Sequence, residues 1–178
     1  MTTGLSTGFS NVNLTFHPLD NSVKRDHFDF GIPELNDYLQ KYARQNQTKG
    51  IAKTIVALTE NSETPIAGYY AISMAELQNE SLPESDLKKL PRYPIPAVRL
   101  AKLAVDRSFQ GQGIGKELLI HALHCAVKLS QEIGVFAVIV DAINEPTKDF
   151  YLKYGFTALP EQPLTLFLPI ATIEKMFK

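Results

Sequence analysis

The sequence carries a candidate anion-binding stretch at Leu103–Gly115, LAVDRSFQGQGIG. It opens with the apolar residues Leu103–Val105, which favour a strand, and this pattern breaks at Asp106. Three glycines then fall within five residues, and an amphipathic helix is predicted to begin near Ile114. Glycines let a ligand approach the backbone closely, and the N–H groups of a helix N-terminus attract negative charge. The stretch therefore predicts an anion site, and a plain strand-to-helix turn is the structural alternative.

The glycine spacing argues against two classes of nucleotide site. The dinucleotide pattern G-x-G-x-x-G fails because neither Gly111 nor Gly113 has a glycine five residues later. The P-loop pattern G-x-x-x-x-G-K-[ST] fails because Gln110 stands at its first glycine and Glu117 where a hydroxyl should bind magnesium. Nicotinamide and nucleoside triphosphate chemistry therefore lose their main support.

A local basic run precedes this stretch, since every charged residue between Asp86 and Asp106 is basic. One interpretation is a solvated loop that lacks acids, and the other is a binding surface for a phosphate-bearing substrate. The run consists of Lys88, Lys89, Arg92, Arg99 and Lys102.

Composition bounds the class of protein. The chain has 178 residues with a net charge of -1, so the molecule as a whole is not an electrostatic partner for nucleic acid or membrane. One cysteine, Cys125, permits no intramolecular disulfide and favours a reducing, cytoplasmic setting. No apolar run approaches the roughly 18 residues that span a bilayer, and no signal peptide or metal-ligand set is evident. We expect one domain over residues 1–178, with residues 1–12 as a flexible lead-in.

Periodicity predicts a mixed α/β fold, with a sheet packed by helices. The predicted helices begin at Pro33, Glu84, Ile114, Glu145 and Ile170, and the one from Ile114 runs to Ile133. The predicted strands cover Asn13–Pro18, Ala52–Thr59, Ile66–Leu77, Val98–Val105, Val135–Val140, Phe156–Leu159 and Thr165–Leu168.

The segment Gln110–Gly115 matches the Q/R-x-x-G-x-G/A motif of the GNAT superfamily of N-acetyltransferases. Asn144 lies seven residues before Tyr151, a spacing that puts two helical residues on one face. Tyr151–Phe156 also resembles the Y-x-K-x-G-F signature of that superfamily. The resemblance covers about Val98–Phe167 and implies a central, mostly antiparallel mixed sheet with a splayed strand pair, flanked by helices.

The resemblance implies acetyl-CoA as co-substrate, no metal, and direct acetyl transfer to an amine. Tyr151 is then the acid that protonates the departing thiolate, and the backbone N–H of Val105 or a neighbour steadies the thioester oxygen. The implied donor contacts are Leu103, Ala104, Val105, Gln110, Gly111, Gln112, Gly113, Ile114, Gly115, Lys116 and Asn144.

A finer resemblance points to the acetyltransferase toxins of bacterial toxin–antitoxin pairs. Phe28–Gly31 followed by Leu35–Leu39 is similar to their F-D-C-G-x-x-x-L-N start, although Phe30 replaces the cysteine. Arg99–Arg107 and Leu166–Pro169 resemble the same branch. This implies acetylation of the α-amine of an aminoacyl-tRNA, with the basic run holding RNA phosphates. It also implies a ribbon-helix-helix antitoxin as partner and a homodimer.

Two alternatives stay open on the sequence. One is a GNAT enzyme that acetylates a small amine, a polyamine or a protein N-terminus. The other is a module that binds acetyl-CoA without turnover.

Overall fold

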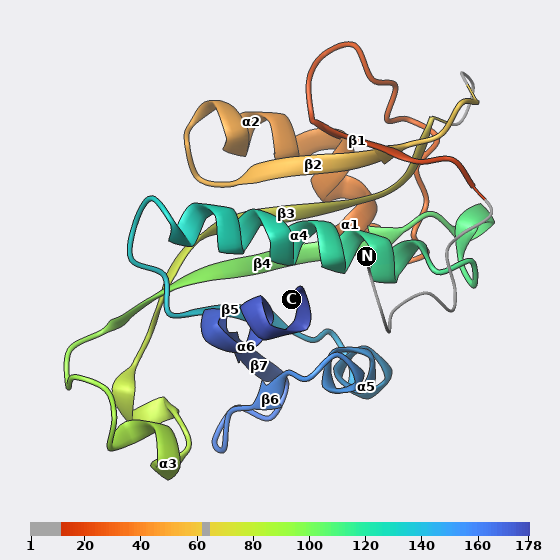
Figure 1. Cartoon of the computed structure of the whole chain (residues 1–178). Coiled ribbons are helices and arrows are strands. Elements are labelled where there is room, and N and C mark those ends of the chain that lie inside the picture. Colours follow the sequence, from red (N-terminus) through yellow and green to blue (C-terminus); the bar gives the residue numbers. More distant parts are fainter. Residues whose placement is uncertain (1–11, 62–64) are drawn as a thin grey trace. The chain divides into compact units, whose positions relative to one another are not determined.

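The computed structural model describes residues 12–61 and 65–178 (Figure 1). The predicted lead-in, residues 1–12, therefore lies almost wholly outside the described residues. The helical segments are α1 (Pro33–Asp37), η1 (Tyr38–Tyr42), α2 (Ala43–Thr48), η2 (Asn79–Ser81), α3 (Glu84–Leu87), η3 (Arg107–Phe109), α4 (Ile114–Ser130), α5 (Glu145–Lys153) and α6 (Ile170–Met176). The strands are β1 (Thr15–Pro18), β2 (Lys53–Leu58), β3 (Ile66–Leu77), β4 (Ile95–Val105), β5 (Ala137–Asp141), β6 (Thr157–Ala158) and β7 (Thr165–Pro169).

The strands follow the order β1-β2-β3-β4-β5-β7-β6 by hydrogen-bonded neighbours. The pairs β1–β2, β2–β3, β5–β7 and β6–β7 are antiparallel, and β4–β5 is parallel. The β4–β5 pairing covers only Ala97–Leu100 and Ala137–Val140, although β4 continues to Val105. The predicted mixed, mostly antiparallel sheet with helices is confirmed.

The contacts of the chain divide it into two compact units, which we describe separately. The first comprises residues 1–73 and 102–122, and the second comprises residues 74–101 and 123–178. The prediction of one domain over the whole chain stays a prediction.

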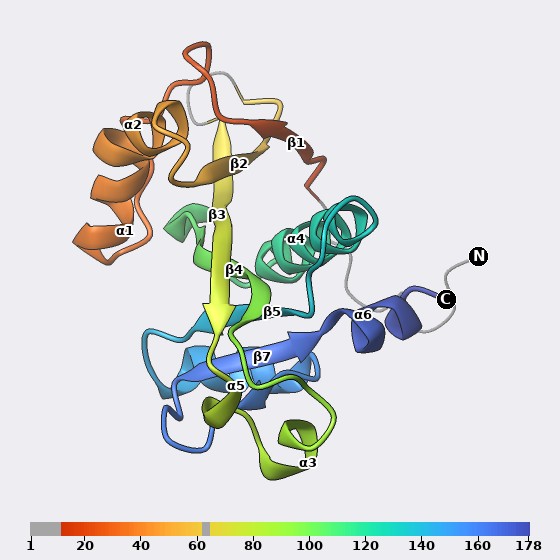
Figure 2. The same cartoon turned by 90° about the vertical axis from the view of Figure 1, so that its left-hand side faces the viewer.

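In the first unit, three antiparallel strands are covered by helices. Figure 2 shows α1 and α2 on one side of β3 and α4, whose first turns belong to this unit, on the other. Leu39 and Ala43 are fully buried, and they pack with Phe28 and Tyr69 in one apolar cluster. The Tyr69 hydroxyl donates to the Leu35 carbonyl at 2.7 Å, which ties the helical segment to β3.

Gly68 of β3 is required because β4 and α4 pass directly over it. A Cβ atom at this position would lie 2.8 Å from the Ala104 carbonyl oxygen and 2.8 Å from Leu118 Cδ1. These atoms belong to β4 and α4, so the absent side chain lets all three elements approach one another.

In the second unit, β5 lies between β4 and β7. Residues 137–140 are buried, as expected for a strand covered on both faces. The neighbouring apolar cluster consists of Leu77, Leu82, Ile95, Ala97, Ala137, Ile139, Leu159 and Phe167. The predicted apolar strand is therefore confirmed, starting two residues later than expected at Ala137.

Most predicted elements are present, and the ends of several differ from the predicted ends. The strand Ile66–Leu77 has the predicted bounds, whereas β4 begins at Ile95, ahead of the predicted Val98. The helix α4 ends at Ser130, before the predicted Ile133, because the Leu129 carbonyl accepts from the N–H of both Glu132 and Ile133 and closes a turn. Among the described residues, no helix is long and apolar enough to cross a membrane.

Candidate active site

The glycine-rich loop runs from the end of β4 to the start of α4 in the first unit. Gly111 has φ +79° and Gly113 has φ +80°, in the left-handed region where side chains cause strain. A Cβ atom built on Gly111 meets no atom within 4 Å, so the space beside the loop backbone is open. The loop therefore needs glycine for its backbone conformation and leaves room for a ligand at its amides.

The start of α4 adds further amide donors next to the loop. The first α-helical bond runs from the Glu117 N–H to the Gly113 carbonyl at 3.2 Å. Backbone N–H groups at the start of an α-helix point away from the helix body, and the helix dipole gives this end partial positive charge. Buried Ile114 fixes the first turn. This donor set fits a diphosphate, as the sequence predicts, and Gln112, Gly115 and Lys116 lie within it.

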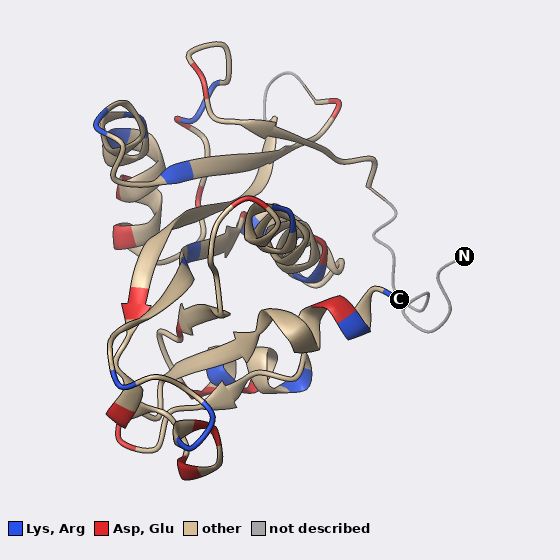
Figure 3. Ribbon diagram, turned by 60° about the vertical axis from the view of Figure 1, so that its left-hand side comes forward, with Lys and Arg blue, Asp and Glu red and all other residues tan. Residues whose placement is uncertain are grey.

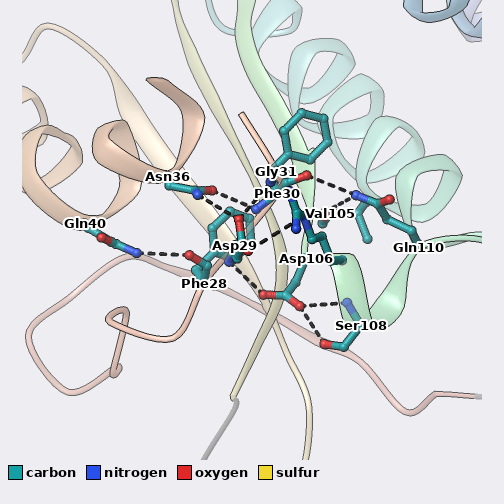
Figure 4. A network of polar contacts seen from close by, with 11 residues as sticks. Phe28, Asp29, Phe30, Gly31, Asn36, Gln40, Val105, Asp106, Ser108 and Gln110 are labelled. Atoms are coloured by element: carbon teal, nitrogen blue, oxygen red, sulfur yellow. Dashed lines mark hydrogen bonds and ion pairs between the residues drawn. The ribbon is translucent and has the colours of Figure 1, made fainter. Parts of the chain in front are cut away.

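Asp106 fixes the chain where β4 ends. Its side chain is 6% exposed, and it caps η3 by accepting from the Ser108 N–H at 2.9 Å. The second carboxylate oxygen accepts from the Asp29 N–H at 2.9 Å (Figure 4). The backbone N–H of Asp106 donates to the Ala67 carbonyl of β3 at 2.8 Å. Asp106 thus joins the loop to β3 and to the N-terminal segment.

Gln110 holds the other end of this turn. Its side-chain amide donates to the Val105 carbonyl at 3.0 Å and to the Phe30 carbonyl at 3.3 Å (Figure 4). The structure therefore gives the predicted donor-binding residue Gln110 a position in which its side chain shapes the loop.

Sequence reasoning missed the polar network around Asp106. Asp29 accepts from the Gly31 N–H and from the Asn36 side-chain amide, each at 2.9 Å. The Asn36 amide hydrogen bond is the largest effect that lowers the pKa of the Asp29 carboxyl below its usual range. One signal was available in the sequence, because Asp followed two residues later by Ser, as in Asp106–Ser108, is typical of a side-chain-capped turn.

The predicted donor strand residues Leu103, Ala104 and Val105 form the end of β4. Ala104 and Val105 are buried, and the Ala104 carbonyl lies against Gly68. The β4–β5 register ends at Leu100, so it does not extend to these three residues. A strand end outside that register fits the predicted pairing with an amide-bearing ligand arm.

Tyr151 lies in α5 in the second unit and is 4% exposed. Its ring makes edge contacts with Phe150, at 5.2 Å between centroids, and with Phe156, at 5.4 Å. Burial raises the pKa of the Tyr151 phenol well above its usual value, and the nearby Asp141 charge acts in the same direction. The phenol therefore stays protonated at neutral pH.

Asn144 precedes α5 and caps it. Its backbone is extended, with φ -163°, and its side-chain oxygen accepts from the Thr147 N–H at 2.9 Å. The helical-face argument for Asn144 and Tyr151 is therefore wrong, because only Tyr151 is inside the helix. The side-chain oxygen of Asn144 is engaged as a cap, which leaves its amide as the group for the predicted donor contact.

The five predicted basic residues have three different environments. Lys88, Lys89 and Arg92 are exposed on the loop after α3, where Figure 3 also shows acidic residues on α3 itself. Arg99 is ion-paired with Asp141, whose other oxygen accepts from Thr165 at 2.9 Å. Lys102 belongs to the first unit, where its ammonium lies 5.5 Å from the Tyr38 ring centroid. The first three are the cations best suited to contact phosphates.

Two histidines on α4 are engaged in packing. His121 Nδ1 lies 2.8 Å from the Tyr70 hydroxyl, and His124 stacks on Phe177 with 3.8 Å between ring centroids. Within residues 12–61 and 65–178, no group of three or more His, Cys, Asp or Glu side chains is placed to hold a metal ion.

Comparison with known proteins assigns the family. The model of the acetyltransferase (GNAT) domain matches residues 66–158. The chain therefore belongs to the GNAT acetyltransferase family, and it is an N-acetyltransferase with acetyl-CoA as its donor.

Particular relatives within that family extend the similarity beyond the matched domain. A tRNA-acetylating toxin of Mycobacterium tuberculosis (strain ATCC 25618 / H37Rv) is 33% identical over 141 residues, which are 79% of this chain and 82% of the toxin. The structure of AtaT complexed with acetyl-methionyl-tRNAfMet has a TM-score of 0.85 and 33% identity, covering 93% of this chain and 100% of that one.

Another AtaT structure contains an antitoxin segment and acetyl-CoA. A tyrosine-to-phenylalanine mutant of the AtaT toxin, bound to the C-terminus of the antitoxin AtaR and to acetyl-CoA, has a TM-score of 0.79 and 28% identity. That comparison covers 93% of this chain and 98% of the toxin.

Proposed function

We propose that this enzyme transfers the acetyl group of acetyl-CoA to the α-amine of an aminoacyl-tRNA and thereby blocks translation as a toxin. The observation that carries the proposal is the similarity to tRNA-acetylating relatives over 79% or more of the chain, well beyond the matched domain at residues 66–158. The N-terminal segment that resembles the toxin branch, Phe28–Gly31, is hydrogen-bonded to the donor loop, so it is part of the working molecule.

The donor is held mainly by backbone groups in this proposal. The amides of the glycine loop and of the first turn of α4 bind the diphosphate, because they are numerous and the helix dipole favours negative charge. The end of β4, Leu103–Val105, pairs with the amide groups of the pantetheine arm. The amide of Asn144 adds a further contact.

The reaction is a direct transfer. The neutral amine attacks the thioester carbonyl carbon, a C–N bond forms, and the C–S bond breaks. Tyr151 donates its proton to the departing sulfur, and the proton that the amine loses restores the phenol through water. Burial keeps the pKa of the Tyr151 phenol above its usual value, so the phenol is neutral when the step begins. An aminoacyl ester amine is less basic than a lysine side chain, so a large fraction is neutral near pH 7.

The acceptor is held through its phosphates. Lys88, Lys89 and Arg92 are exposed on one loop and free to meet an RNA backbone. Arg99 contributes less directly, since Asp141 already binds its guanidinium. A charged tRNA is a cytoplasmic substrate, so we place the enzyme in the cytoplasm. We further propose a homodimer and a ribbon-helix-helix antitoxin as partner.

Expression in a bacterial host tests this proposal. The wild-type chain is expected to arrest growth, and Tyr151→Phe is expected to abolish the arrest because turnover falls by roughly 100-fold or more. Growth rate and acetylated tRNA in the cell extract are the measurements, and acetyl-CoA affinity of the purified variant should change little.

Tyr154→Phe is the matched control, since Tyr154 is partly exposed and packs on Phe150 in the same helix region. It is expected to arrest growth like the wild type. Harmless expression of an enzyme that acetylates small amines would contradict the proposed acceptor. Unaltered turnover in Tyr151→Phe would remove the tyrosine from the acid role.

A further inference from the structure

We infer that Asp106 is a positioning residue for the donor: its carboxylate clamps the start of the glycine loop to the N-terminal segment and so holds the loop amides in their donor-binding arrangement. The inference rests on the proposed donor-binding role of the glycine loop. It assigns a role to a residue outside the loop motif and to a segment 77 residues away in the sequence.

The first step is that the Asp106 carboxylate is buried, which costs free energy unless hydrogen-bond donors surround it. Asp106 is 6% exposed, so its charge is stable only if donors surround it. The Ser108 N–H and hydroxyl supply two hydrogen bonds, and the Asp29 N–H supplies a third at 2.9 Å. Local capping accounts for the two bonds to Ser108, whereas the bond to Asp29 reaches a remote segment.

The second step is that the contact with Asp29 is reciprocal. The Asp29 N–H donates to the Asp106 carboxylate, and the Asp29 carbonyl accepts from the Arg107 N–H at 2.8 Å. Both backbone groups of Asp29 are therefore bound to the turn that leads into the glycine loop. Figure 4 shows Asp29 and Asp106 facing each other across this junction.

The third step is that the N-terminal segment is itself held firmly. The Asp29 carboxylate accepts from Gly31 and Asn36, and the Asn36 side-chain oxygen accepts from the Phe30 N–H at 2.7 Å. The Phe30 carbonyl then accepts from Gln110, the residue directly before Gly111. The same short segment is thus hydrogen-bonded to the turn at Asp106 and at Gln110, on both sides of η3.

The clamp affects the positions of the backbone amides in the glycine-rich loop. The first glycine, Gly111, directly follows Gln110, and the glycines have no side chains that could fix their conformation. Their positions are therefore set by the clamp at Asp106–Gln110 and by the first turn of α4. If the clamp is loosened, the loop must become ordered when the donor binds, and this entropy cost reduces donor affinity. The acid Tyr151 is not altered.

The test compares Asp106→Asn with Asp20→Asn in the full chain. An amide at position 106 places an N–H donor where donors converge, so the remote bond or the local cap is lost. Asp20→Asn makes the same change in charge in an exposed Asp-x-Ser turn, where the carboxylate accepts from the Ser22 N–H at 2.8 Å and from the Ser22 hydroxyl.

Acetyl-CoA affinity by calorimetry and steady-state kinetics with charged tRNA are the measurements, with urea unfolding to establish that each variant is folded. For Asp106→Asn we expect a roughly tenfold rise in the Kd and KM for acetyl-CoA, with kcat at saturating donor within about twofold of wild type. For Asp20→Asn we expect both constants within about twofold.

An unchanged Kd in folded Asp106→Asn, or an equal rise in Asp20→Asn, would overturn the inference. Should Asp106→Asn fail to fold, Asn36→Ala loosens the same clamp from its other side, and a Kd that rises about threefold supports the inference whereas an unchanged Kd refutes it. Wild-type protein that does not bind acetyl-CoA would instead refute the proposed function, so the two failures are distinguishable.

Discussion

The glycine-rich loop and the basic loop differ in how each is proposed to bind phosphate. The glycine loop presents backbone amides, and the turn before it is fixed by hydrogen bonds that the Asp106 carboxylate accepts and that the Gln110 side-chain amide donates. The basic loop presents the side chains of Lys88, Lys89 and Arg92, which are exposed. The turn before the first set of donors is held by hydrogen bonds within the protein, whereas the second set of donors consists of exposed side chains. A small constant donor suits the first, and a large polyanionic acceptor suits the second.

The largest effect is expected when the side-chain cations of the basic loop are removed. The triple variant Lys88→Gln, Lys89→Gln, Arg92→Gln should lose most of the salt dependence of aminoacyl-tRNA acetylation. With three phosphate contacts, wild-type kcat/KM on charged tRNA should fall by roughly 40-fold between about 50 and 200 mM salt, while acetyl-CoA binding falls much less. The measurement is kcat/KM against salt concentration for both variants.

A matched control removes three exposed lysines elsewhere, at Lys128, Lys175 and Lys178. This control should keep the wild-type slope. A flat salt response of the wild type, or equal slopes for the two triple variants, would remove the basic loop from RNA binding and weaken the comparison.

The second largest effect is expected from a substitution in the glycine-rich loop. Gly113→Ala places a side chain at φ +80°, which costs about 1–3 kcal/mol or forces the loop to rearrange. We expect a roughly tenfold rise in the KM for acetyl-CoA with an unchanged salt slope for tRNA. Gly115 lacks a positive φ and lies in the first turn of α4, so Gly115→Ala should have the smaller effect. Equal effects of the two substitutions would contradict a site set by loop conformation.

The smallest effect concerns the support beneath the donor strand. Gly68→Ala introduces a methyl group 2.8 Å from the Ala104 carbonyl oxygen and should lower the free energy of unfolding by about 1–3 kcal/mol. Gly134→Ala is the control, because a Cβ atom there meets nothing within 4 Å. Urea unfolding measures both. A neutral Gly68→Ala would show that β3 and β4 separate easily, so that the donor strand is not held as rigidly as the comparison requires.

Sequence patterns predicted the elements where local chemistry decides the structure. Alternating or continuous apolar residues located β3 and β5, and the glycine spacing located the loop before α4. Gly155 has φ +94° and follows α5, as the predicted helix end requires. Local steric preferences of glycine and the burial of apolar side chains account for these successes.

Features that depend on remote partners were not predictable in this way. The bond from Asp29 to Asp106 joins residues far apart in the sequence, and no local pattern signals it. The π-helical turn Tyr38–Tyr42 interrupts what periodicity predicts as one regular helix. Asn144 was placed by its spacing from Tyr151, although capping residues favour extended backbone just ahead of a helix.

The central claim is transfer of an acetyl group to the α-amine of an aminoacyl-tRNA with Tyr151 as the acid. The most direct measurement follows radiolabel from acetyl-CoA into charged tRNA, deacylated tRNA, free amino acids and a polyamine, with wild type and Tyr151→Phe side by side. The account predicts label on charged tRNA alone, released as the N-acetylated amino acid after mild base hydrolysis of the ester, and nearly none with Tyr151→Phe. Label on the polyamine or on free amino acids in preference to charged tRNA would contradict it.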